Sequence, residues 1–365
     1  MIKKKKLKNF PVQISTAPQN KSDRVTLWVS SGEYNVYDNY EYNYMESDNF
    51  AAKLYEEGLK KCVENLRRQG KEKISLIDIG TGKYMDWALY AADLGVDRIV
   101  ALEGMESTYL KAEKTLQKSG YNNIELLNVW SENYHPEEKF DICISEIIGS
   151  IGGAEGAEVV LADAKRRFLK EDGLMFPSEC RTRAAGVCLK ELVPTLGFHP
   201  ECQYYLENIF KEVGGPFDLR LMLYQCNEDD IKTTHMSIET LNFNKGRIAQ
   251  NALEQKDLEV LEDGFIDGLL LWIQLYSGFG DYIDSLAKNT AWDHIYIPIF
   301  DEPVFAKRGN IMKIECLRSI SDDGVHPDYT FKVNLNGVKG EFKSFHHISK
   351  EGNFKTKSIY KQLFT

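Results

Sequence analysis

Short apolar segments alternate with helical patterns through the first half of the chain, and no other feature restricts its fold as strongly. The apolar segments are 74–82, which includes a glycine turn, 98–102, 124–129 and 140–144. Each contains a run of strand length, and the stretches between them carry the spacing of helices, as in 85–94. Strands that alternate with helices in this way predict a parallel, doubly wound sheet. Such sheets bind ligands where their strands end.

The segment 74–82 reads ISLIDIGTG, a strand that runs into a glycine turn and therefore indicates a nucleotide site. Glycines let the backbone approach a ligand, and an acidic residue about 20 positions later binds ribose hydroxyls. Glu103, at the end of the next strand, occupies that place. Lys83 and Tyr84 stand where a third glycine would be expected. This favours a nucleoside ligand over a dinucleotide and disfavours a nicotinamide oxidoreductase.

The loop 145–155 reads SEIIGSIGGAE and follows the strand 140–144, so it leaves the sheet at the carboxyl end of a strand. It carries Glu146 and Glu155, and the glycines between them allow it to fold back. Two carboxylates brought together without a cation are unfavourable, whereas a guanidinium offers a planar fork of donors that suits both. The loop is either a guanidinium site or a glycine-rich surface loop with two solvated glutamates.

Length, charge and cysteines restrict the class of protein. A chain of 365 residues is long enough for two domains with cores of their own. A net charge of −10 argues against a nucleic-acid binder, which needs a basic face, and is compatible with a cationic substrate. The seven cysteines are scattered and form no CxxC pair, which favours reduced thiols over disulfides or zinc ligands.

Neither a membrane segment nor a metal site is predicted. The Lys-rich segment 1–8 lacks the apolar core of a secretory signal, and no stretch is long and apolar enough to span a membrane. His346 and His347 are adjacent, but no partner ligands are visible in the sequence. We therefore expect a cytoplasmic protein that binds no membrane, nucleic acid or metal.

From Pro177 onward the pattern changes to short strands separated by turns, which is typical of a barrel or sandwich. The segment 197–218 has a helical pattern and is rich in aromatic residues. It either packs on its own barrel or leaves an apolar surface that favours self-association. The expected strands of this half are 219–224, 269–276, 295–300, 311–317 and 329–335, and further helices are expected at 50–69 and 156–170.

With these features in this order, the chain resembles the protein arginine methyltransferases, which use S-adenosylmethionine. LIDIGTG with Glu103 looks like the family's adenosylmethionine motif, and SEIIGSIGGAE looks like its double-glutamate loop. The continuation 168–182, FLKEDGLMFPSECRT, is similar to the family's passage from the nucleotide domain into a β-barrel. The segment 290–304, TAWDHIYIPIFDEPV, resembles the loop and strand that close the substrate pocket.

The resemblance implies an architecture of α/β and β domains. An N-terminal arm covers 1–36, a Rossmann-like S-adenosylmethionine-binding domain covers 37–176, and a β-barrel domain covers 177–365, with a helical dimerisation arm at about 197–218. It implies a homodimer that transfers methyl to an arginine guanidinium of a protein, a peptide or free arginine. The alternatives are methylation of another small-molecule amine or guanidine, and a non-catalytic dimeric scaffold.

The resemblance also assigns residues to roles. Glu146 and Glu155 would clamp the guanidinium and are the catalytic pair. The expected substrate pocket consists of Tyr40, Met45, Asp48 and Trp292. The expected cofactor site consists of Asp78, Gly80, Gly82, Glu103, Trp130, Ser131 and Glu132.

Three positions depart from the family pattern. Ser131 stands where an acidic residue often meets the adenine amine, with Glu132 beside it. Ala51 stands where a basic residue on the N-terminal helix grips the cofactor carboxylate, and the nearest cation, Lys53, is out of register. Ala291 replaces a histidine that pairs with the aspartate at position 48, so that side-chain pair cannot form. These changes affect the grip on the cofactor but leave the paired glutamates in place.

Overall fold

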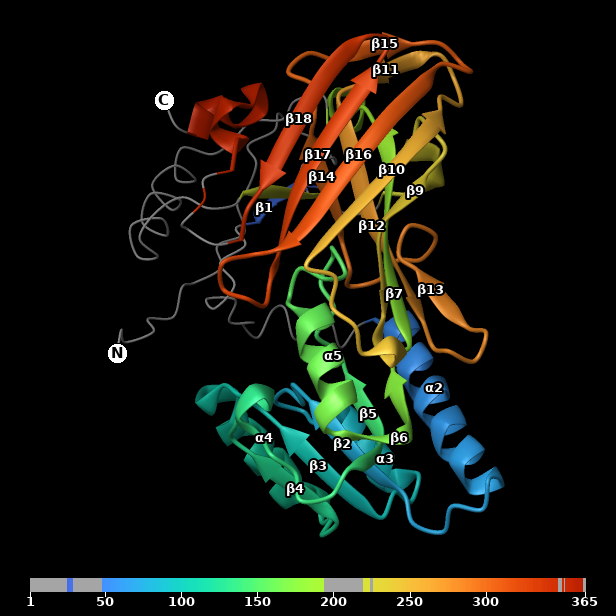
Figure 1. Cartoon of the computed structure of the whole chain (residues 1–365), viewed down its shortest axis with the longest axis vertical. Helices are drawn as coiled ribbons and strands as arrows, with labels where there is room; N and C mark the ends of the chain where they lie inside the picture. Colours follow the sequence, from blue (N-terminus) through green and yellow to red (C-terminus); the bar gives the residue numbers. More distant parts are fainter. Residues whose placement is uncertain are drawn as a thin grey trace.

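The computed structural model describes residues 25–28, 48–193, 219–223, 226–346, 350 and 352–363. Within them the chain forms one unit around a parallel sheet and a second unit of antiparallel strands (Figure 1). The expected fold class, a doubly wound α/β unit followed by a β-structured unit, is confirmed. The expected dimerisation arm at 197–218 lies outside the described residues.

The parallel sheet has the strand order β4-β3-β2-β5-β6. Its strands are β2 (Ser75–Ile79), β3 (Arg98–Leu102), β4 (Ile124–Leu127), β5 (Phe140–Ser145) and β6 (Leu169–Phe176). From β2 the chain runs outward to β3 and β4, and then crosses to β5 and β6 on the other side of β2. The direction of winding therefore reverses between β2 and β5, and their carboxyl ends flank the crevice where such sheets bind ligands.

Four helices accompany this sheet: α2 (Asn49–Arg68), α3 (Asp86–Asp93), α4 (Glu106–Ser119) and α5 (Ala157–Arg167). The expected helices 50–69 and 85–94 are confirmed with small shifts at their ends. The expected helix 156–170 is too long, because α5 ends at Arg167 and β6 follows. Pairing of β6 with β5 outweighs the helical spacing of this segment.

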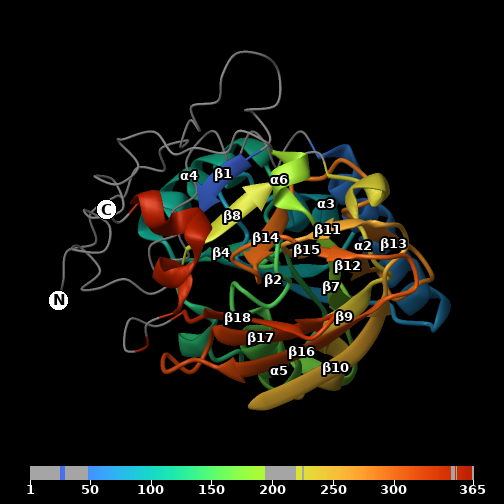
Figure 2. The ribbon, with the colours of Figure 1, turned by 90° about the horizontal axis from the view of Figure 1, so that it is seen from above.

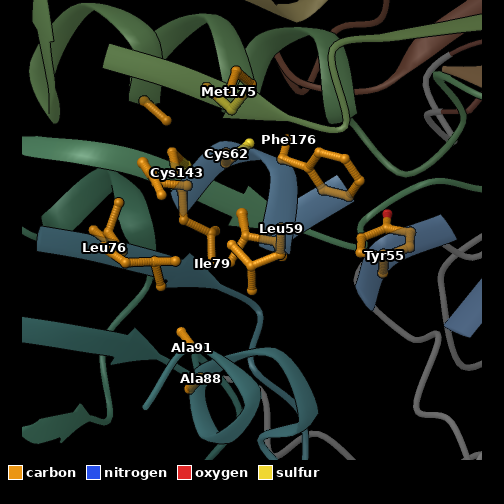
Figure 3. Packing of buried hydrophobic residues seen from close by; sticks show 14 of the residues in the cluster. Tyr55, Leu59, Cys62, Leu76, Ile79, Ala88, Ala91, Cys143, Met175 and Phe176 are labelled. Atoms are coloured by element: carbon orange, nitrogen blue, oxygen red, sulfur yellow. The ribbon is translucent and has the colours of Figure 1, made fainter. Parts of the chain in front are cut away.

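Helix α2 packs closely against the carboxyl end of β6. Leu59 and Cys62 of α2 share a buried cluster with Phe176 (Figure 3). The closest approach is at Gly58, where an added Cβ would lie 2.1 Å from the Phe176 ring. Only a residue without a side chain allows this contact, which holds α2 beside the edge of the sheet that carries the expected site.

A buried carboxylate at the opposite edge joins three strands of the sheet. Asp141, at the start of β5, is fully buried and accepts hydrogen bonds from the amide and hydroxyl of Ser75 on β2. Lys170 of β6 and Lys71 also contact it. Burial opposes ionisation, but hydrogen bonds from both lysines and from Ser75 lower the pKa of Asp141. Lys170, expected on a helix, therefore lies on a strand.

The chain leaves β6 through a cis peptide bond between Phe176 and Pro177 and enters the second unit. One sheet there contains, in order, β1 (Val25–Trp28), β8 (Arg220–Leu223), β14 (His294–Pro298), β12 (Gly268–Tyr276), β7 (Glu179–Val187) and β9 (Met236–Asn242), with β13 (Tyr282–Asp284) beside β12. The other contains β10 (Asn251–Glu259), β16 (Ile311–Ile320), β17 (Pro327–Leu335) and β18 (Val338–Ser344). A small sheet pairs β11 (Gly264–Ile266) with β15 (Val304–Ala306).

The two larger sheets lie one above the other around a shared hydrophobic core (Figure 2). They contact each other along β9 and β10, which gives the unit a barrel-like form. The strands expected from the sequence correspond to β8, β12, β14, β16 and β17. Strand β10 was not expected, because most of its side chains are exposed and its sequence lacks an alternating apolar pattern.

Short helical segments complete the described chain: α6 (Leu189–Leu192) and 3-10 turns at Ser131–Asn133, Glu228–Asp230, Phe243–Lys245, Phe354–Thr356 and Ser358–Leu363. None of the helices in the described residues is long and apolar enough to cross a membrane. The cysteines at 62, 143, 180, 188, 226 and 316 are buried free thiols.

Replacing Asp141 by Asn should destabilise the parallel sheet by about 2–4 kcal/mol, because it leaves the buried donors of Ser75 and the two lysines without their anion. Asp172→Asn is the matched control, since Asp172 also contacts Lys71 but its side chain is 70% exposed. Urea unfolding should show a much smaller loss for the control. Equal losses for the two variants would contradict the role assigned to the buried carboxylate.

Candidate active site

Two acidic residues directly follow neighbouring strands at the carboxyl end of the parallel sheet. Ile79 at the end of β2 pairs with Leu102 of β3 on one side and with Ser145 of β5 on the other. The next residues in β3 and β5 are Glu103 and Glu146. The register of the sheet thus brings the expected ribose-binding carboxylate and the first glutamate of the loop to the same level, on either side of the glycine turn.

Glu103 is held against the glycine turn. Its Oε2 atom accepts a hydrogen bond from the amide of Gly82 at 3.1 Å, and its Oε1 atom accepts one from the amide of Met105 at 2.9 Å. The side chain is buried, and this burial raises the pKa of Glu103 while both hydrogen bonds oppose the rise. Gly80 and Gly82 have φ values of 74° and 67°, in the left-handed region that glycine adopts readily.

Asp78 lies beneath this turn. Its carboxylate is buried and accepts a hydrogen bond from the Thr81 hydroxyl at 2.6 Å. Burial raises the pKa of Asp78 to about 7, against the effect of the Thr81 hydrogen bond. The structure therefore gives Asp78 a contact that shapes the turn itself.

Trp130, Ser131 and Glu132 follow β4 on the same side of the sheet. The Trp130 indole packs over Gly104, where an added Cβ would lie 2.5 Å from the ring, and it remains 53% exposed. Ser131 begins a 3-10 turn, and its carbonyl accepts a hydrogen bond from Arg167 at the end of α5. A flat, partly exposed aromatic surface therefore lies next to Glu103.

The indole of Trp87 holds the first glutamate of the loop. Its Nε1 atom donates a hydrogen bond of 2.8 Å to Oε2 of Glu146. Trp87 stacks on Tyr55 of α2 with 4.7 Å between ring centroids, and the Tyr55 hydroxyl donates to the carbonyl of Ser145. Sequence reasoning missed Trp87 and Tyr55, because both contacts join segments that are far apart in the sequence.

The environment of Glu146 disfavours a bare negative charge. Burial raises the pKa of Glu146 to about 7, against the effect of the Trp87 hydrogen bond. The negative charges of Asp86, Asp48 and Asp78 add to the rise. A cation placed beside this carboxylate would favour its ionised form.

The loop folds back on itself, as expected from its glycines. Cγ of Glu155 lies 3.4 Å from the position that a Cβ on Gly149 would occupy. The amide of Gly152 donates to Oγ1 of Thr182, and the amide of Gly153 donates to Oε1 of Glu239, both at 2.9 Å. The Glu155 end of the loop is therefore attached to the antiparallel unit, whereas Glu146 is attached to the parallel one.

The segment that contains Ala291 and Trp292 closes over the same loop. The buried Trp292 indole donates through Nε1 to the carbonyl of Ile148 at 2.8 Å. Oδ1 of Asp48 caps α2, and its Oδ2 atom accepts a hydrogen bond of 2.6 Å from the amide of Ala291. The substitution to alanine removes a side-chain pair, but a backbone amide keeps this segment in contact with Asp48.

Two nearby residues do not replace the missing groups. Lys53 is 71% exposed and pairs with Glu57, so its cation lies on the outer face of α2. His294 is buried, and its Nε2 atom contacts the carbonyl of Ser285. Tyr40 and Met45, which were expected in the substrate pocket, lie outside the described residues.

Comparison with known proteins identifies the type of enzyme. The family described as PRMT5 arginine-N-methyltransferase matches residues 18–176. Protein arginine N-methyltransferase 1 of Saccharomyces cerevisiae is 23% identical over 75% of this chain and 81% of its own length. The arginine N(omega)-methyltransferase of Streptomyces achromogenes subsp. streptozoticus is 24% identical over 72% of this chain and 71% of its own.

The chain is similar to the protein arginine methyltransferases, and the resemblance expected from the sequence is confirmed. It is an S-adenosylmethionine-dependent enzyme that methylates an arginine guanidinium, as expected from the sequence. These relatives give no support to methylation of another amine.

Solved structures of the family share the fold. The Trypanosoma brucei PRMT1 enzyme-prozyme heterotetrameric complex with AdoHcy has a TM-score of 0.65 and 15% identity, and the match covers 83% of this chain and 97% of that one. Arabidopsis thaliana protein arginine methyltransferase 10 has a TM-score of 0.66 and 16% identity, with coverage of 85% and 98%. At this identity the likeness concerns the fold.

The structure also gives His346 neighbours that the sequence did not reveal. Asp323 and His326, in the connection between β16 and β17, lie beside it within reach of a shared ion. The two imidazole rings stack almost parallel, with 3.9 Å between centroids and 5° between planes. Because nitrogen lone pairs lie in the ring plane, parallel rings do not direct them to one point. The observed arrangement is a stacked pair beside a carboxylate.

Replacing Trp87 by Phe in this arginine methyltransferase should raise the pKa of Glu146 above about 7 by roughly one unit. The change removes the hydrogen bond that favours the ionised carboxylate but keeps an aromatic ring against Tyr55. Carboxyl NMR titration of protein labelled at glutamate, with the Glu146 signal assigned through Glu146→Gln, would measure it. Tyr55→Phe is the control and should leave this pKa unchanged.

Proposed function

We propose that Glu146 and Glu155 together bind the guanidinium of the substrate arginine and orient it for methyl transfer. The observation that carries this proposal is the folded double-glutamate loop at the carboxyl end of β5, beside the glycine turn and Glu103. Burial raises the pKa of Glu146, and a cationic partner would favour the ionised form of this carboxylate. The acceptor is an arginine of a protein or peptide, or free arginine.

The chemistry follows from the weakness of the nucleophile. A guanidinium has a pKa above 12, and its nitrogen lone pairs are delocalised. Bidentate pairing with two carboxylates holds its plane and draws positive charge away from the attacking nitrogen. The proton of that nitrogen is lost to a carboxylate or to water. Orientation and electrostatic stabilisation then supply most of the acceleration.

The turn at Gly80–Gly82, Glu103 and Trp130 fit the expected cofactor, S-adenosylmethionine, which supplies an electrophilic methyl group on a sulfonium. Glu103 offers a fixed carboxylate to ribose hydroxyls, and the exposed indole offers a surface on which an adenine can stack. Ser131 and Glu132 directly follow Trp130 in the 3-10 turn. Trp292 supports the substrate side through its contact with Ile148.

We also propose a division into an arm at 1–36, a cofactor domain at 37–176 and a barrel domain at 177–365. The parallel sheet ends at Phe176 and the antiparallel unit begins at Glu179, which supports the second boundary. The buried free thiols of the described residues support a reducing compartment, the cytoplasm. Thiol content after non-reducing extraction would test this location, and oxidised cysteines would contradict it.

Glu146→Gln and Glu155→Gln should each reduce methyl transfer by roughly a hundredfold or more, as expected for loss of an electrostatic stabiliser. The amide keeps the size of the side chain and removes its charge. Affinity for S-adenosylmethionine, measured by calorimetry, should change little. Transfer of labelled methyl to free arginine and to arginine-containing peptides gives the rate, with Glu137→Gln on the exposed surface as control.

The same assay has an expected pH dependence. Because the pKa of Glu146 is about 7, the free enzyme loses this carboxylate below that pH, while the substrate guanidinium stays charged. The wild-type kcat/KM should therefore fall about tenfold per pH unit well below pH 7. Turnover that survives either glutamine substitution within about threefold would contradict the clamp.

Self-association through 197–218 is a further part of the proposal, supported by Tyr204, Tyr205, Ile209 and Phe210 in that segment. Charged residues at Tyr205 and Phe210 should convert a dimer into a monomer in light scattering. A wild-type chain that is monomeric at micromolar concentration would exclude this role.

A further inference from the structure

A buried carboxylate of the antiparallel unit holds the double-glutamate loop from behind. Glu239 lies on β9 and is 2% exposed. Its Oε1 atom accepts hydrogen bonds from the Gly153 amide at 2.9 Å and from the Thr182 hydroxyl at 2.6 Å. Oγ1 of Thr182 in turn accepts the Gly152 amide. The consecutive buried amides of Gly152 and Gly153 therefore donate to Thr182 and Glu239, which are hydrogen-bonded to each other.

The other oxygen of Glu239 faces the interior of the barrel-like unit. The Tyr329 hydroxyl donates to Oε2 at 3.0 Å, and Nε of Arg318 lies 3.6 Å from it. Arg318 is also buried, and its guanidinium pairs with Glu158 in the first turn of α5. Burial opposes the charge of Arg318, but Glu158 and Glu239 raise its pKa.

Stability alone does not account for this charged cluster. Burying an ion pair removes two charges from water, and apolar side chains of similar size often stabilise a protein as well or better. Apolar side chains, however, cannot accept the amides of Gly152 and Gly153, and a buried amide without an acceptor is costly. The cluster is explained by the loop that it holds.

The contact also fixes the path of the loop closely. An added Cβ on Gly153 would lie 2.9 Å from Oε2 of Glu239, and one on Gly152 would lie 2.5 Å from Sγ of Cys180. Glu155 follows two residues later, and Glu158 is anchored by Arg318 on its other side. The backbone that carries Glu155 is thus held at both ends by residues of β7, β9 and β16.

We propose that Glu239 and Thr182 are positioning residues for arginine methylation, which set the location of Glu155 through the amides of Gly153 and Gly152. This proposal rests on the function proposed above for the paired glutamates. Through Glu239 the antiparallel unit determines the separation of the two carboxylates, and the buried guanidinium of Arg318 lies beside Glu239 on its other side. Neither positioning residue contacts the guanidinium in this scheme.

The test compares two variants that each remove one hydrogen bond to Glu239. Thr182→Val removes the hydroxyl that also accepts the loop amide, whereas Tyr329→Phe removes only the hydroxyl on the interior side. Thr182→Val should lower kcat at least tenfold, since small displacements of a substrate-orienting group are costly. Tyr329→Phe should stay within about threefold of wild type. Thr182→Ser keeps the hydroxyl and should restore kcat.

Kcat and KM are measured with the arginine acceptor that the wild-type enzyme methylates, together with calorimetric affinity for S-adenosylmethionine and thermal unfolding. Unchanged cofactor affinity with reduced kcat in Thr182→Val supports the proposal. Equal kcat losses in Thr182→Val and Tyr329→Phe that follow their loss of stability would overturn it, as would wild-type kcat in Thr182→Val. If Glu155→Gln is inactive in that last case, the clamp stands and only the positioning role fails.

Discussion

Exclusion of water from carboxylates at one edge of the parallel sheet is the constraint on which the site depends. Burial raises the pKa values of Asp78, Glu103 and Glu146. Asp78 is the last residue but one of β2, and Glu103 and Glu146 directly follow the neighbouring strands β3 and β5. The hydrogen bonds that hold them come from neutral groups: a hydroxyl, backbone amides and the Trp87 indole. Such donors fix the positions of the carboxylates without cancelling their charge. A cationic substrate therefore gains more from this edge than it would from solvated carboxylates.

The two ends of the double-glutamate loop are held by different parts of the molecule. Glu146 follows β5 and is fastened by Trp87 of α3, whereas the backbone before Glu155 is fastened by Thr182 and Glu239. The segment at Ala291 and Trp292 adds a third attachment, from the antiparallel unit to Asp48 and to the loop. The distance between the paired carboxylates therefore depends on how the two units pack, and mutations at their contact would affect catalysis from outside the pocket.

The sequence predicted β2, β3 and β5 well because these strands are buried on both faces and stand out as apolar runs; every residue of β2 and β5 is buried. The sequence also predicted roles for the glycine turn, Glu103 and the paired glutamates, because the spacing of these residues carries the chemistry. The end of α5 was misplaced, because only pairing with β5 shows that β6 begins at Leu169. Trp87, Thr182 and Glu239 could not be found, since each acts through a contact distant in sequence. The contact between Asp48 and Ala291 was not predicted for another reason: its donor is a backbone amide, which no side-chain pattern reveals.

The pairing of β1 with β8 has a consequence for how the protein is made. Val25 pairs with Leu223, so the edge of the largest antiparallel sheet joins residues about 200 positions apart. The whole parallel sheet lies between them in the chain. A ribosome therefore releases the cofactor-binding unit before the partner of β1 exists, and this unit can fold first. Strand β1 can pair with β8 only after the parallel unit has been synthesised. When this unit is already folded, it shortens the distance that the chain must close between β1 and β8.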